Sequence, residues 1–383
     1  MSTTPTTRHY PRAIAMLVGT IIGAGIFGVP YVVARSGVAI GLIHFAVLTV
    51  ALLLIHLFFG ELTLRTNAHH RLVGYAEKYW GAPGKWLAAV SGILGIYGAL
   101  LAYIILGGSF LHQLAGQTFG GTPWSYSIIF AVVGAFVIAL GLRLIEEVEF
   151  ILTAFLFIAL ALIFIVGGQR VDTANWMTVN TTHALLPYGA ILFSLGGASV
   201  IAELRDVLRG RERRLASAIT WGSLIAAVLT AIFVLVVVGV SGSKTSPEAI
   251  AGLAPILGHS IVVLGSILGF LAVATSFLAL GLYMHGVFHL DFGLPRFWAF
   301  LVAMGVPIGV FLLGNPTFTE VIMITGGVFG GLDGLLIALL VLRARTHGDR
   351  QPEFRVRLPS VVNWIVALMF AVGIAVTVWE VIR

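Results

Sequence analysis

The chain has 383 residues, of which 59% are hydrophobic and only 10% are charged. Because soluble domains carry about 25% charged residues, this composition excludes a soluble enzyme, a disordered chain and a nucleic-acid-binding module, and it predicts a protein embedded in a lipid bilayer. The net charge of +6 comes from 22 basic and 16 acidic residues, and the lack of cysteine excludes disulfides, thiol catalysis and cysteine-based metal sites.

Eleven apolar runs are long enough to cross a membrane, because a hydrocarbon core about 30 Å thick needs about 20 helical residues. These runs are too long and too continuous for the strands of a β-barrel. We therefore expect an all-α polytopic membrane protein. Its eleven helices are predicted over 12–34, 38–64, 84–114, 125–142, 145–167, 185–208, 214–240, 259–289, 294–313, 318–343 and 359–382.

The basic residues indicate the orientation of these helices. If the tail 1–11 lies in the cytoplasm, the cytoplasmic segments hold 18 of the 22 Lys and Arg residues. Basic residues concentrate on the cytoplasmic side of membrane proteins, so this asymmetry favours a topology signal over a basic ligand-binding patch. The sequence predicts a protein of the cell membrane with its N-terminus inside and its C-terminus outside.

The spacing of the helices predicts an internal repeat. The starts of helices 1–5 and of helices 6–10 differ by 169 to 176 residues. Five is an odd number, so the second unit must enter the membrane from the opposite side. The result is the inverted repeat of many secondary transporters, with units 12–167 and 185–343, and the last helix (359–383) lies outside it.

Glycines gather at mid-depth in the first helix of each unit, and Gly23 and Gly196 are 173 residues apart. Glycine costs about 1 kcal/mol in a helix interior, so these clusters predict that helices 1 and 6 are broken. Close helix packing through small residues is the alternative. A break exposes N–H groups, here about Ala24 to Ile26, that suit a carboxylate, and carbonyls, here about Gly19 to Ile22 with Phe193 and Ser194, that suit an ammonium or Na⁺.

The sequence Gly-Thr-Ile-Ile-Gly-Ala-Gly-Ile-Phe-Gly-Val-Pro at 19–30 resembles the first helix of amino acid permeases. The resemblance is to the amino acid/auxin and hydroxy/aromatic amino acid permease families of the amino acid–polyamine–organocation superfamily, which have the LeuT-type fold. Residues 186–194 and 203–205 resemble helix 6 of these permeases, and 275–278 resembles their helix 8. The resemblance implies eleven helices and a 5+5 inverted repeat with broken helices 1 and 6.

The resemblance also implies a Na⁺ site between helices 1 and 8. Its ligands would be the carbonyls of Gly19, Ile22 and Ala272 and the hydroxyls of Thr275 and Ser276, which are hard oxygen ligands suited to a small cation. Hydroxyls bonded back to their own helix are the alternative.

Two departures from the family bear on coupling. Some relatives have, at the position of Ile26, an asparagine that binds a second sodium ion. Because isoleucine cannot bind a cation, a second Na⁺ site is not expected here. Helix 5 lacks the lysine of proton-coupled relatives and has only Glu146, Glu147 and Glu149 at its inner end. This favours Na⁺, or protons carried elsewhere; Asp333 and His285 are the candidate proton carriers or gates, with an ordinary bonded role as the alternative for each.

The break and the resemblance together give the predicted substrate contacts. The predicted substrate contacts are Thr20, Ile22, Gly23, Ala24, Gly25, Ile26, Tyr103, Phe193, Ser194, Gly196 and Gly197.

The single histidines His44, His56 and His112 are expected to be hydrogen-bonded residues of the core or of helix interfaces, since no spacing of histidines and carboxylates makes a metal site.

These features predict an ion-coupled symporter that imports neutral, branched or aromatic amino acids by alternating access. The alternatives are a membrane-embedded amino acid sensor without net transport and a transporter of another small amine. An enzyme is not expected, because no nucleophile–base pair or metal spacing appears. The expected partners are the amino acid, the bilayer and a coupling Na⁺ or H⁺; no cofactor and no nucleic acid are expected, and a monomer suffices.

Overall fold

Apolar helices of membrane-spanning length make up most of this computed structural model, which describes residues 9–140, 157–158 and 160–382. Within those residues, eight helices are long and apolar enough to cross a membrane, and a bent pair forms a further candidate span. Helices are the expected solution, because they satisfy every backbone N–H and C=O without water. The fifth predicted helix, 145–167, lies mainly outside the described residues.

The first half of the chain begins with a helix in two pieces. The predicted range 38–64 and the described part of 125–142 each form one continuous helix, and the helix predicted over 84–114 is longer than expected. The bounds are α1 (His9–Ile21), η1 (Ala24–Phe27), α2 (Val29–Ser36), α3 (Val38–Arg65), α4 (Leu72–Phe119), α5 (Pro123–Ala139) and the π-helical turn η2 (Ile163–Gly167).

The second half of the chain, from Pro187, also begins with a helix in two pieces. Its fifth helix contains a π-helical turn. The bounds are α7 (Pro187–Leu195), α8 (Ala198–Val207), α9 (Leu215–Ser241), the short α10 (Ala254–Leu257), α11 (His259–Gly286), η8 (Val287–Asp291), α12 (Arg296–Gly314), α13 (Phe318–Ile324), η9 (Thr325–Gly330) and α14 (Gly331–His347), followed by α15 (Ser360–Ile382).

The helix α4 is longer than the predicted run 84–114 because a polar stretch precedes the apolar part. The segment 72–80 includes Glu77 and Lys78, so hydropathy alone starts the helix too late. Gly81 separates this segment from the rest with a φ of 70°. Glycine adopts such a positive φ without strain, so the chain bends here and continues as a long apolar helix.

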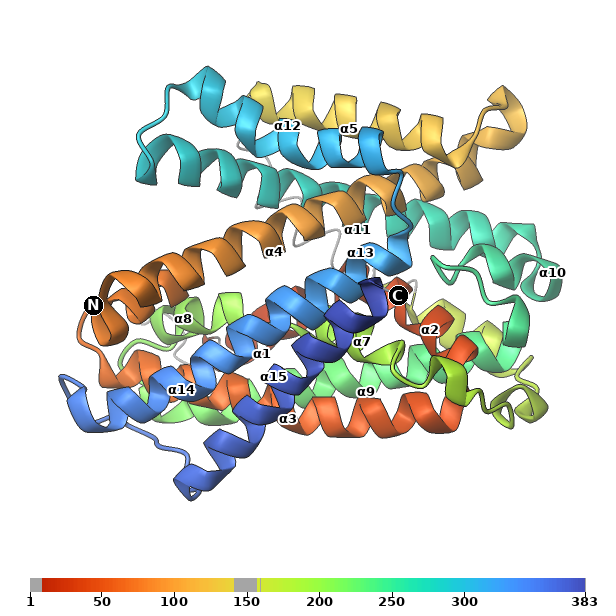
Figure 1. The fold of residues 1–383 in the computed structure, drawn as a ribbon. Coiled ribbons are helices and arrows are strands. Elements are labelled where there is room, and N and C mark those ends of the chain that lie inside the picture. Colours follow the sequence, from red (N-terminus) through yellow and green to blue (C-terminus); the bar gives the residue numbers. More distant parts are fainter. Residues whose placement is uncertain (1–8, 141–156, 159, 383) are drawn as a thin grey trace, which may run out of the picture.

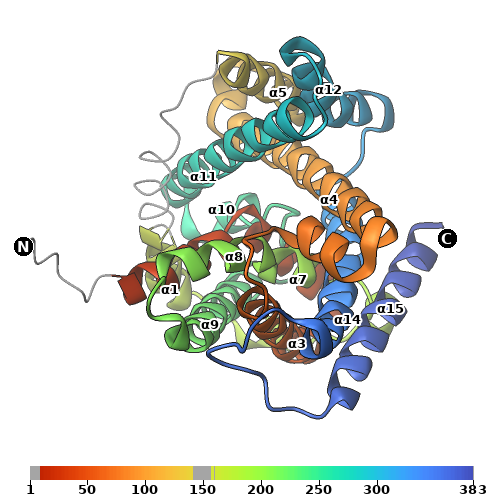
Figure 2. The same cartoon turned by 90° about the vertical axis from the view of Figure 1, so that its left-hand side faces the viewer.

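The helices fall into two groups that face one another (Figures 1 and 2). One group contains α4, α5, α11 and α12, which pack on each other. The other contains α1, α3, α8 and α9, also in mutual contact. The helix α14 packs on both groups, through α3 and α4; α7 packs on α3 and α9, α13 packs on α4 and α7, and α15 packs along α14.

A buried ion pair joins α3 to α14 at the arginine-rich end of the bundle. Glu61 is fully buried and binds Arg345 through both carboxylate oxygens, at 2.9 and 3.1 Å. Arg65 bonds the same carboxylate at 2.9 Å. Two cations therefore compensate one buried anion, as a charge in such a place requires.

The segment 348–358 between α14 and α15 is bonded back to the end of α3. The amide of Val356 donates to Glu61 Oε2 at 3.1 Å, and the amide of Asp349 donates to the Arg65 carbonyl at 2.9 Å. The Asp349 carboxylate also accepts from Lys78. The hydrogen bond from Lys78 and that from the Asn67 amide hold the pKa of Asp349 below its ordinary value. The segment thereby connects α3, α4 and α15.

Candidate substrate site at two helix breaks

The first break lies between α1 and α2. The helix α1 ends at Ile21, Gly23 is extended (φ −110°, ψ −154°), and the chain resumes as the single turn η1. The two halves are bent by 47°. In a continuous helix, the amides of Gly23 and Ile26 would bond the carbonyls of Gly19 and Ile22. Here they bond the carbonyls of Ile21 and Gly23 instead, so the carbonyls of Gly19 and Ile22 lose their helical partners.

The second break lies between α7 and α8. Gly196 is extended (φ −65°, ψ 125°) and Gly197 has a φ of −147°, so neither continues the helix. Gly196 is exposed whereas Gly197 is buried. The broken helices that the sequence predicts at Gly23 and Gly196 are therefore present.

Glycines at each break allow close contact with the other broken helix: Gly25 lies against Ser194, and Gly197 lies against Ile21. A Cβ on Gly25 would lie 2.7 Å from the Cα of Ser194, and a Cβ on Gly197 would lie 2.7 Å from Cγ1 of Ile21. Neither distance leaves room for a side chain larger than that of glycine. The turn η1 therefore lies directly against the end of α7, and Gly197 lies directly against the end of α1.

Ser194 contributes a polar atom at this junction. Its hydroxyl is buried and has no hydrogen-bond partner among the described residues. A buried polar atom without a partner costs free energy, so this hydroxyl is suited to accept a ligand group or a water. The neighbouring Phe193 is half-buried, and its ring packs on Gly25.

Aromatic rings surround η1. Phe27 contacts Phe110 of α4 edge to face, with centroids 5.2 Å apart, and Phe233 of α9 in the same way at 6.0 Å. Edge-to-face pairs of this kind are favourable. The first break therefore rests on a rigid aromatic wall that spans both helix groups.

The predicted ion ligands lie on α1 and α11. The turn η1 packs against α11, and Thr275 is buried on that helix. Its hydroxyl donates to its own helix, with the Leu271 and Ala272 carbonyls both at 3.1 Å. This is the alternative arrangement named above, and it still leaves the lone pairs of the hydroxyl oxygen free to bind a cation. Ser276 is half-buried beside it.

The other polar candidates lie apart from the breaks. Asp333, in the first turn of α14, accepts from Ser91 of α4 at 2.8 Å and so bridges two helices. His285 lies ten residues beyond Thr275, about 15 Å along the helix, where it contacts the Arg296 carbonyl at 3.3 Å.

Two further predicted contacts have ordinary environments. Thr20 is exposed, and its hydroxyl bonds the Met16 carbonyl of its own helix at 2.9 Å. Tyr103 is half-buried on α4. The predicted residues Ile22, Ala24, Gly25 and Ile26 are all buried. Within the described ranges, no group of three or more acidic or histidine side chains could hold a metal ion.

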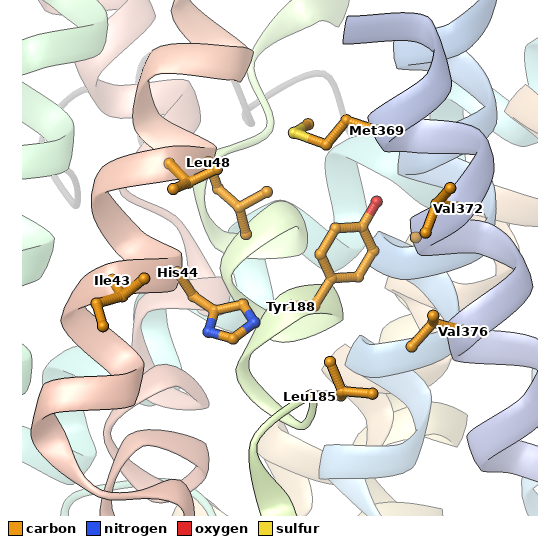
Figure 3. Close-up of a pocket in the computed structure, with 10 residues that line it drawn as sticks. Ile43, His44, Leu48, Leu185, Tyr188, Met369, Val372 and Val376 are labelled. Carbon is orange, nitrogen blue, oxygen red and sulfur yellow. The ribbon is translucent and has the colours of Figure 1, made fainter. Parts of the chain in front are cut away.

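A cavity of about 250 Å³ lies elsewhere, between α3, α7 and α15 (Figure 3). Its lining is apolar except for His44 and Tyr188. It contains no residue predicted to bind substrate or ion. The cavity is therefore separate from the two breaks, although Tyr188 lies on the same helix as Ser194.

An acidic side chain that the sequence analysis missed lies in the loop before α11. Glu248 accepts from Gln113 of α4 at 2.9 Å, and the same Gln113 accepts from Ser266 of α11 at 2.6 Å. Burial raises the pKa of the Glu248 carboxyl above its ordinary value. The next residue, Ala249, is buried with a φ of 66°, a conformation that costs free energy for alanine. Only the tertiary contacts, and no local motif, identify this loop.

Comparison with known proteins supports the fold. The fold is similar to that of MhsT, whose crystal structure was determined in complex with L-phenylalanine: the TM-score is 0.62 with 18% identity, over 98% of each chain. Tyrosine-specific transport system 1 of Haemophilus influenzae is 25% identical over 283 residues, which are 70% of each protein. Tyrosine-specific transport system 2 of the same organism is 30% identical over 217 residues, 55% of this chain and 53% of that protein.

A family model describes nearly the whole chain. The model of the tryptophan/tyrosine permease family matches residues 7–380. Together with the apolar spans, this match indicates an integral membrane protein that transports amino acids rather than an enzyme. The chain therefore belongs to the tryptophan/tyrosine permease family.

Proposed function

We propose that the protein is an ion-coupled symporter that imports an aromatic amino acid, tyrosine or tryptophan, by alternating access. The observation that carries this proposal is the contact of Gly25 with Ser194, which brings two broken helices together. Family membership and the tyrosine-specific relatives support the substrate class.

The free backbone groups suit the two charges that every amino acid carries. The carboxylate would dock on the N–H groups of Ala24 and Gly25, where the helical turn η1 begins, since the Ile26 amide already bonds the Gly23 carbonyl. The ammonium would dock on the carbonyls of Phe193 and Ser194 and on those at the end of α1. The Ser194 hydroxyl would add a further bond.

The aromatic part of the substrate would be held by apolar contacts. Phe193 is half-buried beside Gly25, and Phe27 joins the aromatic wall behind η1. A tyrosine or tryptophan ring gains from such surroundings through burial and edge-to-face contacts. Tyr103 of α4 would face the same substrate from the opposite helix group.

Alternating access would use the two helix groups of Figure 2. The helices α1, α3, α7, α8 and α9 would rock against α4, α5, α11 and α12 around the breaks. The observed breaks at Gly23 and Gly196 are 173 residues apart, which supports an inverted repeat within eleven helices. The arginine-rich end would face the cytoplasm, and one chain carries both breaks, so a monomer would suffice.

The coupling ion would be Na⁺ between α1 and α11. The carbonyls of Gly19 and Ile22, freed by the break, and the carbonyl of Ala272 would join the hydroxyls of Thr275 and Ser276. This set contains only hard oxygen ligands, which Na⁺ prefers. A proton carried by another group, such as Asp333, is the competing arrangement.

Uptake into proteoliposomes tests the proposal. Purified protein is reconstituted, and the accumulation of labelled tyrosine and tryptophan is followed with an inward Na⁺ gradient, an inward proton gradient or neither. Leucine serves as the non-aromatic comparison. Accumulation of an aromatic amino acid only with an ion gradient supports the symporter, whereas saturable binding without accumulation under any gradient would favour a sensor.

A further inference from the structure

His56 of α3 is bonded on both ring nitrogens at the second break. The amide of Gly197 donates to His56 Nε2 at 3.2 Å, and His56 Nδ1 contacts the Ser223 hydroxyl of α9 at 2.9 Å. The histidine is 1% exposed. The expected role of His56 as a bonded core histidine is confirmed, but its partner is the backbone of the break itself.

The bond from Gly197 determines the protonation of the ring. Because an amide can only donate, Nε2 must present a lone pair, and the proton of the neutral ring lies on Nδ1. Nδ1 then donates to the Ser223 oxygen. The ring is therefore neutral and has one fixed tautomer, with one nitrogen used to accept and the other to donate.

Gly197 is the N-cap residue that directly precedes α8. The first amides of a helix have no partner within that helix, and short polar side chains usually supply one. Gly197 has no side chain, and no side-chain cap from its own segment is present. The backbone amide of Gly197 itself donates to a histidine that lies 141 residues earlier in the chain.

The same point also joins α1 to the break. A Cβ on Gly197 would meet Ile21 and Leu17 of α1, and a Cβ on Gly222, next to Ser223, would meet Leu17 at 2.8 Å. Leu17 is fully buried between them. Four helices, α1, α3, α8 and α9, therefore converge on this one amide.

We infer that His56 is a positioning residue, which holds the Gly197 amide in place and thereby fixes the geometry of the second break around the substrate. His56 is not among the predicted substrate contacts. It acts through Gly197, whose neighbours Gly196 and Ser194 lie at the candidate site. The effect on uptake rests on the proposed function, whereas the effect on the geometry of α8 does not.

The test compares two replacements of His56, one that keeps a hydrogen-bond acceptor and one that removes it. In His56→Gln, the side-chain oxygen lies four bonds from Cα, as Nε2 does, and can still accept from Gly197. In His56→Leu the side chain fills a similar volume, but the hydrogen-bond acceptor is lost. His44→Leu on the same helix is the matched control, because His44 contacts only the Ile40 carbonyl of its own helix, at 3.1 Å, among the contacts described.

The first measurement reports the position of α8 without any transport. The chain has no cysteine, so Ser199→Cys, at an exposed site in the first turn of α8, creates a single reactive thiol. Its labelling rate with a maleimide is compared in reconstituted protein. We expect His56→Leu to change this rate about tenfold, because a buried amide without an acceptor is strongly disfavoured, while His56→Gln and His44→Leu keep the parent rate.

The second measurement is uptake of labelled tyrosine. We expect His56→Leu to raise the KM about tenfold or more, with the amount of folded, inserted protein unchanged by size-exclusion chromatography, and His56→Gln to restore it. Parent-like labelling and KM in His56→Leu would overturn the inference, as would a His56→Gln variant that behaves like His56→Leu. If the parent itself does not accumulate tyrosine, the proposed function fails while the labelling rates still decide the role of His56.

Discussion

Gly25 and Ser194 touch without an intervening side chain, so that the turn after the first break rests directly on the end of α7. The hypothetical Cβ of Gly25 would lie 2.7 Å from the Ser194 Cα and 3.1 Å from the Phe193 ring. The Phe193 ring can move, but the backbone at Ser194 cannot yield cheaply. This contact sets the separation of the two sets of freed backbone groups.

Gly25→Ala is expected to impair uptake while leaving the protein folded. The added methyl group overpacks the junction, and overpacking costs about 1–3 kcal/mol, which corresponds to roughly a 5- to 150-fold loss in apparent affinity for tyrosine. Binding and uptake of labelled tyrosine measure it. The control is Gly309→Ala on α12, where a Cβ meets nothing within 4 Å; equal effects of the two changes would show that the junction has no special role.

Glu61→Gln is expected to destabilise the folded protein. The change leaves Arg65 and Arg345 facing a neutral side chain in a buried site. Removal of one partner of a buried ion pair costs about 3–5 kcal/mol. The loss is measured as a lower midpoint of thermal unfolding in detergent.

The matched control for Glu61 is Glu77→Gln in α4. Glu77 pairs with Lys85 at 3.1 Å, but the two side chains are 51% and 45% exposed. Exposed pairs contribute about 0–1 kcal/mol, so its unfolding midpoint should stay near that of the parent. A Glu61→Gln protein as stable as the Glu77→Gln protein would refute the structural role of the buried pair.

Thr275→Val is expected to abolish the Na⁺ dependence of uptake. The substitution keeps the branched shape and removes the hydroxyl oxygen of the proposed ion site. Uptake is measured against Na⁺ concentration at constant ionic strength. Thr220→Val serves as the control, because that hydroxyl also bonds its own helix, at 2.9 Å from the Ala216 carbonyl, but on α9. Normal Na⁺-driven uptake by Thr275→Val would exclude the site.

Glu248 is expected to make the protein less stable as the pH rises. Burial raises its pKa in the folded state above the ordinary value of 4.5, so above that pH the unfolded chain releases the proton first. The unfolded state then binds fewer protons, and the free energy of unfolding falls. Below the ordinary pKa, both states are protonated and Glu248 has no effect.

Glu248→Gln tests this pH dependence. The amide keeps an oxygen that can accept from Gln113, but it cannot ionise. The unfolding midpoint of the variant should therefore fall less steeply than that of the parent as the pH is raised from 4.5 toward neutrality. Identical slopes for the two proteins would show that the carboxyl is not buried in solution.

The sequence predicts this fold well where a strong local signal exists. Apolar runs locate the membrane-spanning helices, and the glycines at Gly23 and Gly196 locate both breaks to within about two residues. Helix ends are predicted less accurately, because an apolar run ends at the first charged residue whereas the helix itself can continue past it. The start of α4 at Leu72, before Glu77 and Lys78, shows this.

The tertiary partners of the site could not be predicted from one sequence. Nothing in the sequence near His56 indicates that Gly197, 141 residues later, supplies its partner. The contact of Gly25 with Ser194 has no local signature either, because any small residue pattern is also compatible with ordinary helix packing. Such pairings depend on how the helices assemble, which local propensity does not encode.

The ion pair between Glu61 and Arg345 has a consequence for biosynthesis. The two residues are 284 positions apart, and the Val356 amide that also bonds Glu61 is 295 positions away. At about 5–20 residues per second, a ribosome adds Arg345 and Val356 tens of seconds after it has made α3. During that time Glu61 has only Arg65, on its own helix, as a partner, so the packing of α3 against α14 and the segment 348–358 can be completed only when nearly the entire chain has been translated.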